Sequence, residues 1–537
     1  MSLFPFRVRR MRVRLMQVGA AFVAATMIAG CGSNYRPVVT PISPNGPSAQ
    51  PQSLAVVVSS PSPTAPGVAT VIDYAGDTVL VQAQIGPGPL DFTLSESGSV
   101  GYTVNSDGTL TNFPVSQTDP QEKHITYSTL PTTAQVVGLF SPATGLWAAD
   151  QTGNNIDVLT GGTGGAETYK LSVPVASTPV IVTGGSFGGQ HEYALSMNNS
   201  TTPAGSVVAY DDMTCNTTPS TIAQTGEADS IEVATYTVSA RIPLQKCPVY
   251  AIQSTDNRRF FVLNRGSDTV SVINSQLNTL DTGCAPPTGC TNQNGQLYFT
   301  HPVLPLSTTA LTATGVTPPN CNLAVDPTCG GMTTTAGPVY AEYNSTTSQL
   351  VVANYDGGTI SIIDVSLDQY GNDSPTFGTT YTVHVGNTAT PYPAAVTVLN
   401  DGTRAYTANQ GDDSGSGNGT VSIVNLSSHT VEKTLSVVGH PRTVVSTQNS
   451  LYGKVYVAAP DTPYVTIVRT DQDIVDTTVL VEGNVVDVRV TTQNASGGNA
   501  NVTSRRPGAG QPCYLPPALE TATYGANPTL ADCQTQP

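Results

Sequence analysis

Charged residues are scarce in this chain. Asp, Glu, Lys and Arg make up 11% of its 537 residues, whereas soluble domains usually carry about 25%. Long runs of Glu, Lys, Leu and Ala, which favour helices, are missing too. Glycine (50 residues) and proline (41) are plentiful, and Val and Thr recur in short runs. A chain poor in helix formers and rich in turn formers and β-branched residues is predicted to be all-β.

Basic residues are few as well. The chain has 21 Lys and Arg against 37 Asp and Glu, which gives a net charge of -16. A surface with this excess of acid repels phosphate backbones, so we expect no nucleic-acid partner. The charge is sufficient to keep a protein soluble and requires no further function.

Motifs that carry chemistry are rare. The six histidines show no metal-ligand spacing, and no haem-attachment Cys-x-x-Cys-His occurs. Residues 184–188 match G-x-S-x-G, but no helix pattern follows, as a nucleophile elbow requires. Residues 412–419 are rich in oxygen ligands but lack the EF-hand pattern, so a solvated hairpin tip is expected. We therefore predict no catalytic residue, no cofactor and no metal site.

The N-terminus has the features of an export signal. A basic stretch over residues 7–14 precedes the apolar segment 15–28, which is short for a transmembrane helix but typical of a signal peptide. The segment runs into Ile28-Ala29-Gly30-Cys31, which resembles the lipobox of bacterial lipoproteins. The resemblance implies that residues 1–30 are a signal peptide.

That resemblance also implies attachment to a membrane. In lipoproteins the thiol of the cysteine, here Cys31, receives diacylglycerol and its freed amine is acylated, for example with palmitate; several acyl chains hold a protein firmly. Gly32 follows instead of Asp, which in diderm bacteria implies the outer membrane. Residues 31–53 read as a flexible, lipid-anchored tether. We expect a monomeric envelope protein on the periplasmic or surface face of the outer membrane.

Eight further cysteines suggest disulfides, because the chain is expected to be exported and their number is even. Proximity suggests structural staples in loops, with the pairs Cys215–Cys247, Cys284–Cys290, Cys321–Cys329 and Cys513–Cys533. Crossed pairing among the middle four is an alternative, because sequence alone does not fix the connectivity.

A short pattern recurs along the body of the chain. An apolar strand ends at Asn or Asp, a polar turn follows, and a second strand alternates Val or Ile with Ser. Alternation lets one face of a sheet be buried, because side chains two residues apart share a face. The clear copies are 261–273, 351–364 and 406–425, and weaker copies begin at Tyr102, Trp147, Tyr193 and Tyr456.

The pattern resembles the YVTN repeats of β-propellers, which also occur in surface-layer and lactonase-like propellers. Tyr406-Thr407-Ala408-Asn409, followed by Val421-Ser422-Ile423-Val424-Asn425, carries the resemblance well. It covers residues 54–490 and implies four-stranded blades stacked around an axis. The Asn positions are expected to be scaffolding, since Asn tolerates left-handed turns and caps its own backbone.

The repeats predict a closed ring. Seven hairpins lie between residues 102 and 469, and strands within 54–81 supply one more, so we expect eight blades, or seven if a weak hairpin is misassigned. The lone strand 485–490 is expected to join the sheet begun by the N-terminal strands, which hides two open edges. The expected divisions are a propeller over 54–494, cysteine-containing loop inserts near 211–247 and 281–338, and a Gly/Pro-rich tail over 495–537.

Two functions fit this organisation. The anchor, tether and stapled loops favour a binding or scaffold module of the cell envelope, with the membrane as one partner and a protein or glycan as another. The alternative is a lactonase-like hydrolase of an exported sugar derivative, which needs carboxylates and a base to converge on the central channel. Gly439-His440-Pro441-Arg442 resembles a turn of lactonase-like propellers, but Thr443 stands where their histidine would be. His440 and Arg442 are therefore expected at the surface of a blade entry.

Overall fold

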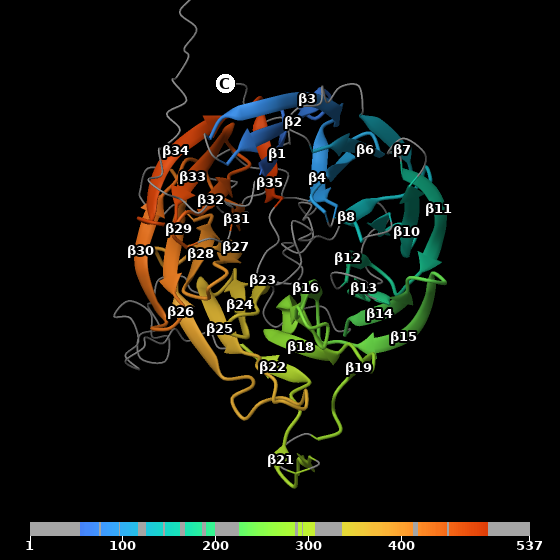
Figure 1. The fold of residues 1–537 in the computed structure, drawn as a ribbon. Helices are drawn as coiled ribbons and strands as arrows, with labels where there is room; N and C mark the ends of the chain where they lie inside the picture. The colour runs from blue at the N-terminus through green and yellow to red at the C-terminus, as the bar shows by residue number, and fades with distance from the viewer. Residues whose placement is uncertain are drawn as a thin grey trace, which may run out of the picture. The chain divides into compact units, whose positions relative to one another are not determined.

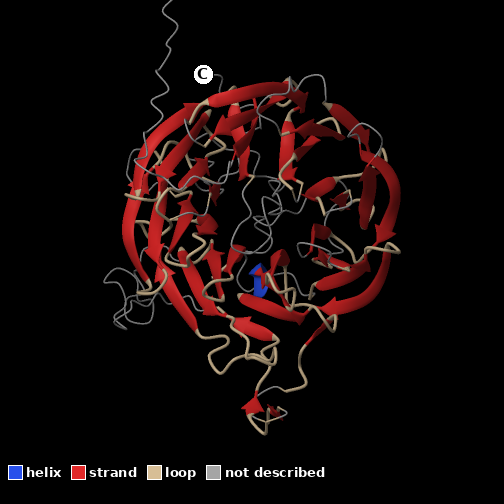
Figure 2. Cartoon of the chain, in the orientation of Figure 1, coloured by secondary structure: helices blue, strands red, loops and turns tan. Residues whose placement is uncertain are grey.

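The computed structural model describes residues 54–491, except 75–76, 96, 116–124, 143–144, 162–166, 185–189, 199–224, 285–287, 293, 307–335, 412–416 and 448–449. These residues belong to one compact unit, Pro51–Pro537. Strands dominate it, and the described ranges contain one short 3-10 helix, η3 (Arg265–Ser267), and no α-helix (Figure 2). Within the same ranges, no helix has the length and apolarity needed to cross a membrane.

Eight antiparallel blades form a β-propeller (Figure 1). Blade 1 contains β4 (Pro89–Leu94), β5 (Val100–Asn105), β6 (Thr109–Pro114) and β7 (Thr126–Thr129). Blade 2 contains β8 (Val136–Phe140), β9 (Leu146–Asp150), β10 (Asn155–Gly161) and β11 (Glu167–Pro174). Blade 3 contains β12 (Pro179–Gly184), β13 (His191–Ser196), β14 (Glu227–Glu232) and β15 (Thr237–Pro243).

The next four blades repeat this order. Blade 4 contains β16 (Pro248–Gln253), β17 (Arg259–Asn264) and β18 (Thr269–Asn274), and its outer edge is shared by β19 (Thr279–Leu280) and β22 (Val303–Pro305). Blade 5 contains β23 (Pro338–Asn344), β24 (Gln349–Asn354), β25 (Thr359–Asp364) and β26 (Thr380–His384). Blade 6 contains β27 (Pro393–Val398), β28 (Arg404–Asn409), β29 (Thr420–Asn425) and β30 (Thr430–Ser436). Blade 7 contains β31 (Thr443–Ser446), β32 (Lys454–Ala458), β33 (Tyr464–Arg469) and β34 (Ile474–Leu480).

Blade 8 closes the ring. Its order is β35 (Asn484–Val490), β1 (Leu54–Ser60), β2 (Pro66–Asp73) and β3 (Val79–Pro87), so the last strand pairs with the first. Val57 lies opposite Val488, and every residue of β1 and β35 is buried. The expectation of a shared closing sheet is confirmed, and the count is eight blades rather than seven.

One strand of each blade faces the axis. These inner strands are β4, β8, β12, β16, β23, β27, β31 and β35, and each contacts the inner strands on both sides around the ring (Figure 1). Five of them begin with proline, which suits a strand start because proline has no N–H for the ladder. The shared faces of the blades form the apolar core.

The asparagine of the repeat clamps the turn between the second and third strands. Asn409 Nδ2 donates to Thr420 Oγ1 (3.1 Å) and Ser422 Oγ (2.9 Å). Asn105, Asn264 and Asn354 make the same pair of hydrogen bonds to the matching hydroxyls of their own third strands. These asparagines are scaffolding, as the sequence indicated.

Left-handed residues join neighbouring blades. Five turns between third and fourth strands contain a non-glycine residue with φ between 50° and 56°, and each of these residues meets a side chain of the preceding blade. The pairs are Lys454 with Asp77, Trp147 with Tyr236, Tyr193 with Asn278, Tyr381 with His429, and Tyr406 with Asp473.

The inserts differ in extent from those expected. The stretch 211–247 contains β14 and β15, which complete blade 3, so the loop part is shorter. The stretch 281–338 contains a small hairpin, β20 (Cys290–Thr291) with β21 (Leu297–Tyr298), and the strand β22. Because β19 and β22 pair with opposite ends of β18, residues 281–302 form an arm that interrupts the outer strand of blade 4.

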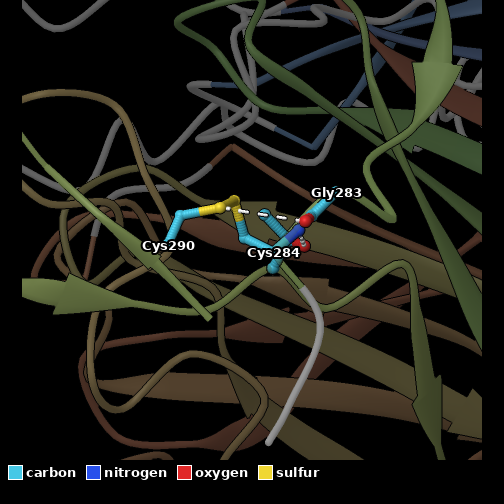
Figure 3. Close-up of a disulfide and its surroundings, with 4 residues drawn as sticks. Gly283, Cys284 and Cys290 are labelled. Carbon is cyan, nitrogen blue, oxygen red and sulfur yellow. Dashed lines mark hydrogen bonds between the residues drawn. A yellow bond between two sulfur atoms is a disulfide. The ribbon is translucent and has the colours of Figure 1, made fainter. Parts of the chain in front are cut away.

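A disulfide lies in this arm. Cys284 and Cys290 are joined by an S–S bond of 1.98 Å, beside Gly283 (Figure 3). The arm is tied to blade 5, since the backbone N–H of His301 donates to Asp373 Oδ2 (2.9 Å) and Asp373 also pairs with the buried Arg259. Cys247 is also disulfide-bonded. The other predicted cysteines lie outside the described residues: Cys31, Cys215, Cys321, Cys329, Cys513 and Cys533.

Candidate functional site

Ionisable side chains gather on the inner strands. Six of them, which we call the axial cluster, are buried and interact with one another: Asp91 (β4), Tyr250 (β16), Tyr340 and Glu342 (β23), and Asp487 and Arg489 (β35). Inner strands do not need such residues to pack, because β8 is built from Val, Gly, Leu and Phe alone and is equally buried.

Arg489 connects opposite sides of the ring. Its Nη2 donates to Asp487 Oδ2 at 2.7 Å, and its charge also interacts with Tyr340, Tyr250 and Asp91. Blades 8 and 4 stand opposite one another in a ring of eight, so the interaction with Tyr250 crosses the axis. Burial alone would lower the pKa of Arg489, but Asp487 and the other groups outweigh it and raise that pKa. The guanidinium is therefore charged.

Two tyrosines face Arg489 as a pair. The rings of Tyr250 and Tyr340 lie 4.7 Å apart between centroids. Burial, and then the neighbouring phenol of Tyr340, raises the pKa of Tyr250 well above its ordinary value, so the Tyr250 phenol is neutral and can both donate and accept hydrogen bonds. Asp91 lies at the same level along the axis as Tyr250 and Tyr340. Each of the three is the third residue of an inner strand that begins with proline and has a register shift after it.

Glu342 lies one step further along β23. Its Oε2 accepts from the Val398 backbone N–H (2.6 Å), and Thr397 Oγ1 lies 3.3 Å from both oxygens and 3.1 Å from Ser446 Oγ. Burial raises the pKa of Glu342 to about 8, and these hydrogen bonds and the charge of Arg489 only partly oppose the shift. The carboxyl is thus mostly protonated near pH 7, and it can give up or take a proton in that range.

A second arrangement lies where β31 begins. His440 Nδ1 is 2.6 Å from Asp461 Oδ2, and the His440 backbone N–H donates to Asp461 Oδ1 (2.9 Å). Its Nε2 is buried and has no hydrogen-bond partner among the described residues. The expectation that His440 and Arg442 are surface residues is wrong, because each is 3% exposed. The turn packs under the loop of Asp461 instead of projecting outward.

The axial cluster was missed from sequence, although one signal was present. Charged residues interrupt otherwise apolar strands at Asp91, Glu342 and the Asp487-Val488-Arg489 run. The motif positions 185–188 and 412–416 lie outside the described residues. Within the part of the chain that the structure describes, no group of three or more His, Cys, Asp and Glu side chains is arranged to hold a metal ion.

Comparisons with known proteins place the chain among distant structural neighbours only. No protein-family model and no curated protein matches it. Apo AztD from Citrobacter koseri is 11% identical and has a TM-score of 0.48, over 82% of this chain and 97% of that chain. A candidate 6-phosphogluconolactonase from Bacteroides fragilis is 13% identical, with a TM-score of 0.43 over 83% and 99% of the two chains. The dihydro-heme d1 dehydrogenase NirN is 12% identical, with a TM-score of 0.46 over 81% and 74%. Likeness of this degree carries no information on ligand or reaction.

Proposed function

We propose that this chain is a lipid-anchored protein of the bacterial cell envelope whose propeller binds a small polar ligand at the axial cluster. The burial of these polar groups on the inner strands carries the binding role, because Arg489 pairs with Asp487 at 2.7 Å and the rings of Tyr250 and Tyr340 lie 4.7 Å apart between centroids. A few convergent polar groups in an apolar surround are typical of small-molecule sites.

The binding role is tested by ligand-induced stabilisation. A compound that binds the folded protein raises its unfolding temperature, so a library of small polar metabolites is screened against the full mature protein. A compound that stabilises the wild type should bind at least about tenfold more weakly to Glu342→Leu, which has a similar volume but no hydrogen-bonding group.

A second buried carboxyl provides the matched control. Asp157 lies in β10, away from the inner strands, and hydrogen-bonds Ser172 at 2.5 Å. Asp157→Asn should leave the affinity unchanged. Wild-type affinity in Glu342→Leu, for every compound that stabilises the protein, would refute an axial site.

The anchor is proposed from Ile28-Ala29-Gly30-Cys31. The wild type should partition into the detergent phase and sediment with membranes, whereas Cys31→Ala should be released in soluble form. A Cys284→Ala/Cys290→Ala variant is the control. It loses two other cysteines but keeps the lipobox, so it should stay with the membrane. Membrane retention of Cys31→Ala would rule out the lipid anchor without affecting the binding role.

A lactonase-like hydrolase is the second candidate. His440 favours it, because Asp461 orients the imidazole and Nε2 is left without a partner among the described residues, as a general base requires. If the wild type hydrolyses glucono-δ-lactone, His440→Gln should lower kcat about a hundredfold. A wild-type rate equal to that of the buffer would exclude this activity and leave binding alone.

A further inference from the structure

The charges of the inner strands are unequal in number. Arg489 is the one cationic side chain on the eight inner strands, all of which the structure describes, and it stands against three carboxyls, Asp91, Glu342 and Asp487. Arg489 is already paired with Asp487 at 2.7 Å. The cluster therefore has no surplus positive charge to offer a ligand.

An anionic ligand would be disfavoured at this place. A phosphate or carboxylate that approached Arg489 would have to displace Asp487 and lie beside Asp91, and like charges repel strongly where water is excluded. The net charge of -16 on the whole chain adds to this repulsion. A cationic ligand would meet the guanidinium of Arg489, but the carboxyls outnumber that cation, so the charge count opposes anions rather than cations.

Hydroxyl groups would find complementary partners in the cluster. The carboxyl oxygens of the aspartates accept hydrogen bonds, the protonated carboxyl of Glu342 can also donate, and the phenols of Tyr250 and Tyr340 do both. The hydroxyls of Thr397 and Ser446 continue this network beside Glu342. The paired tyrosine rings add an apolar surface for the C–H groups of a ligand.

We propose that the ligand of the axial cluster is a neutral, hydroxyl-rich molecule of the unphosphorylated sugar class. This inference rests on the proposed binding role and adds the chemical class of the ligand. It follows from one cation that is paired with one carboxyl and outnumbered by the carboxyls of the inner strands, together with the hydroxyl and phenol groups of the same strands.

The test compares sugars that differ in charge. Titration calorimetry on the full mature protein uses glucose, galactose and N-acetylglucosamine as neutral probes, glucose 6-phosphate and gluconate as anions, and glucosamine as a cation. At least one neutral sugar should bind, and its anionic counterparts should bind at least about tenfold more weakly. In Asp91→Asn the preference over the phosphate should shrink by about tenfold, because one opposing carboxylate is gone.

The outcomes separate the two proposals. Tighter binding of an anion or of glucosamine would overturn the ligand class while the binding role stands. Binding of none of the six probes would overturn the class, and the binding role would fail only if the wider library also gave no ligand that depends on Glu342. If Asp91→Asn kept the wild-type preference for the neutral sugar over its phosphate, the axial cluster would not be the source of that preference.

Discussion

Tyr193 donates a 2.6 Å hydrogen bond from its phenol to Asn278 Oδ1, across the boundary between blades 3 and 4. Asn278 has a φ of 52°, in the turn that leads into the fourth strand of its blade. Asparagine tolerates this left-handed conformation better than most residues. Tyr193 and Tyr406 therefore contact the next blade, whereas Asn409, three residues after Tyr406, hydrogen-bonds within its own blade.

These contacts between blades should contribute measurably to stability. Tyr406 donates to Asp473 Oδ1 at 2.5 Å, so Tyr406→Phe should lower the free energy of unfolding by about 2 kcal/mol, as expected when a hydrogen bond to a charged group is lost. Tyr456 Oη has no hydrogen-bond partner among the described residues. Tyr456→Phe, the control, should change stability by less than about 0.5 kcal/mol. Equal losses in urea unfolding of the two variants would contradict this account.

The clamp at the turn is incomplete in two blades. Thr407 Oγ1 donates to Asn409 Oδ1 at 2.9 Å, whereas Asn354 has Val352 at the matching position and its Oδ1 has no partner among the described residues. Val352→Thr should supply the missing donor and raise the free energy of unfolding by about 1 kcal/mol.

The neighbouring position supplies the control for that change. Val351 points to the other side of β24, because successive side chains alternate along a strand, and it is fully buried. Val351→Thr should lower stability, since its hydroxyl would be buried among apolar side chains. If urea unfolding showed that Val352→Thr and Val351→Thr both lower stability, then Val352→Thr does not supply a hydrogen bond that Asn354 Oδ1 lacks.

Stability should depend on pH through Glu342. Its folded-state pKa of about 8 lies above the ordinary glutamate value of 4.5, so the folded protein holds a proton that the unfolded chain releases. The stabilisation is complete below about pH 4.5 and is lost as the pH rises toward 8, at up to about 1.4 kcal/mol per pH unit.

Glu342→Gln should remove this part of the pH dependence. Urea unfolding at several pH values between 5 and 8 would show a shallower slope for Glu342→Gln than for the wild type. Glu482 is an exposed carboxylate beside the start of β35, and Glu482→Gln should keep the wild-type slope. Identical slopes for all three proteins would mean that Glu342 does not hold its proton.

The arm on blade 4 should respond to reduction separately from the ring. Residues 281–302 leave the outer strand and return to it, so the pairing of β18 with β19 and β22 does not depend on the Cys284–Cys290 bond. In Cys284→Ser/Cys290→Ser, limited proteolysis should cut the arm faster while the thermal unfolding temperature stays nearly the same. A large fall in that temperature would show that the arm supports the whole ring.

Much of the fold could be predicted from sequence because its period is local. Alternation of apolar and polar residues every second position, ending at an asparagine, identifies the second and third strands of most blades. It also identified the strand over 485–490, which pairs with β1. The strands β14 and β15 were missed, since acidic residues stand at both ends of β14 and its pattern is irregular.

The candidate site could not be predicted in the same way. Asp91 and Arg489 are almost 400 residues apart along the chain and interact only because the ring closes. Glu342 alternates with apolar neighbours like any outward-facing residue, and only the inner position of β23 shows that it is buried. The burial of His440 likewise depends on a tertiary contact with Asp461, and the residues next to His440 in the sequence do not reveal that contact.

The sheet that closes the ring also sets a time order for folding. Strands β1, β2 and β3 are synthesised first, but their partner β35 is among the last described segments to be made. Until then the edge of β1 is unpaired and can associate with other chains. The nascent chain therefore spends most of its synthesis with the edge of β1 unpaired, and loss of residues 484–490 would leave that edge unpaired permanently.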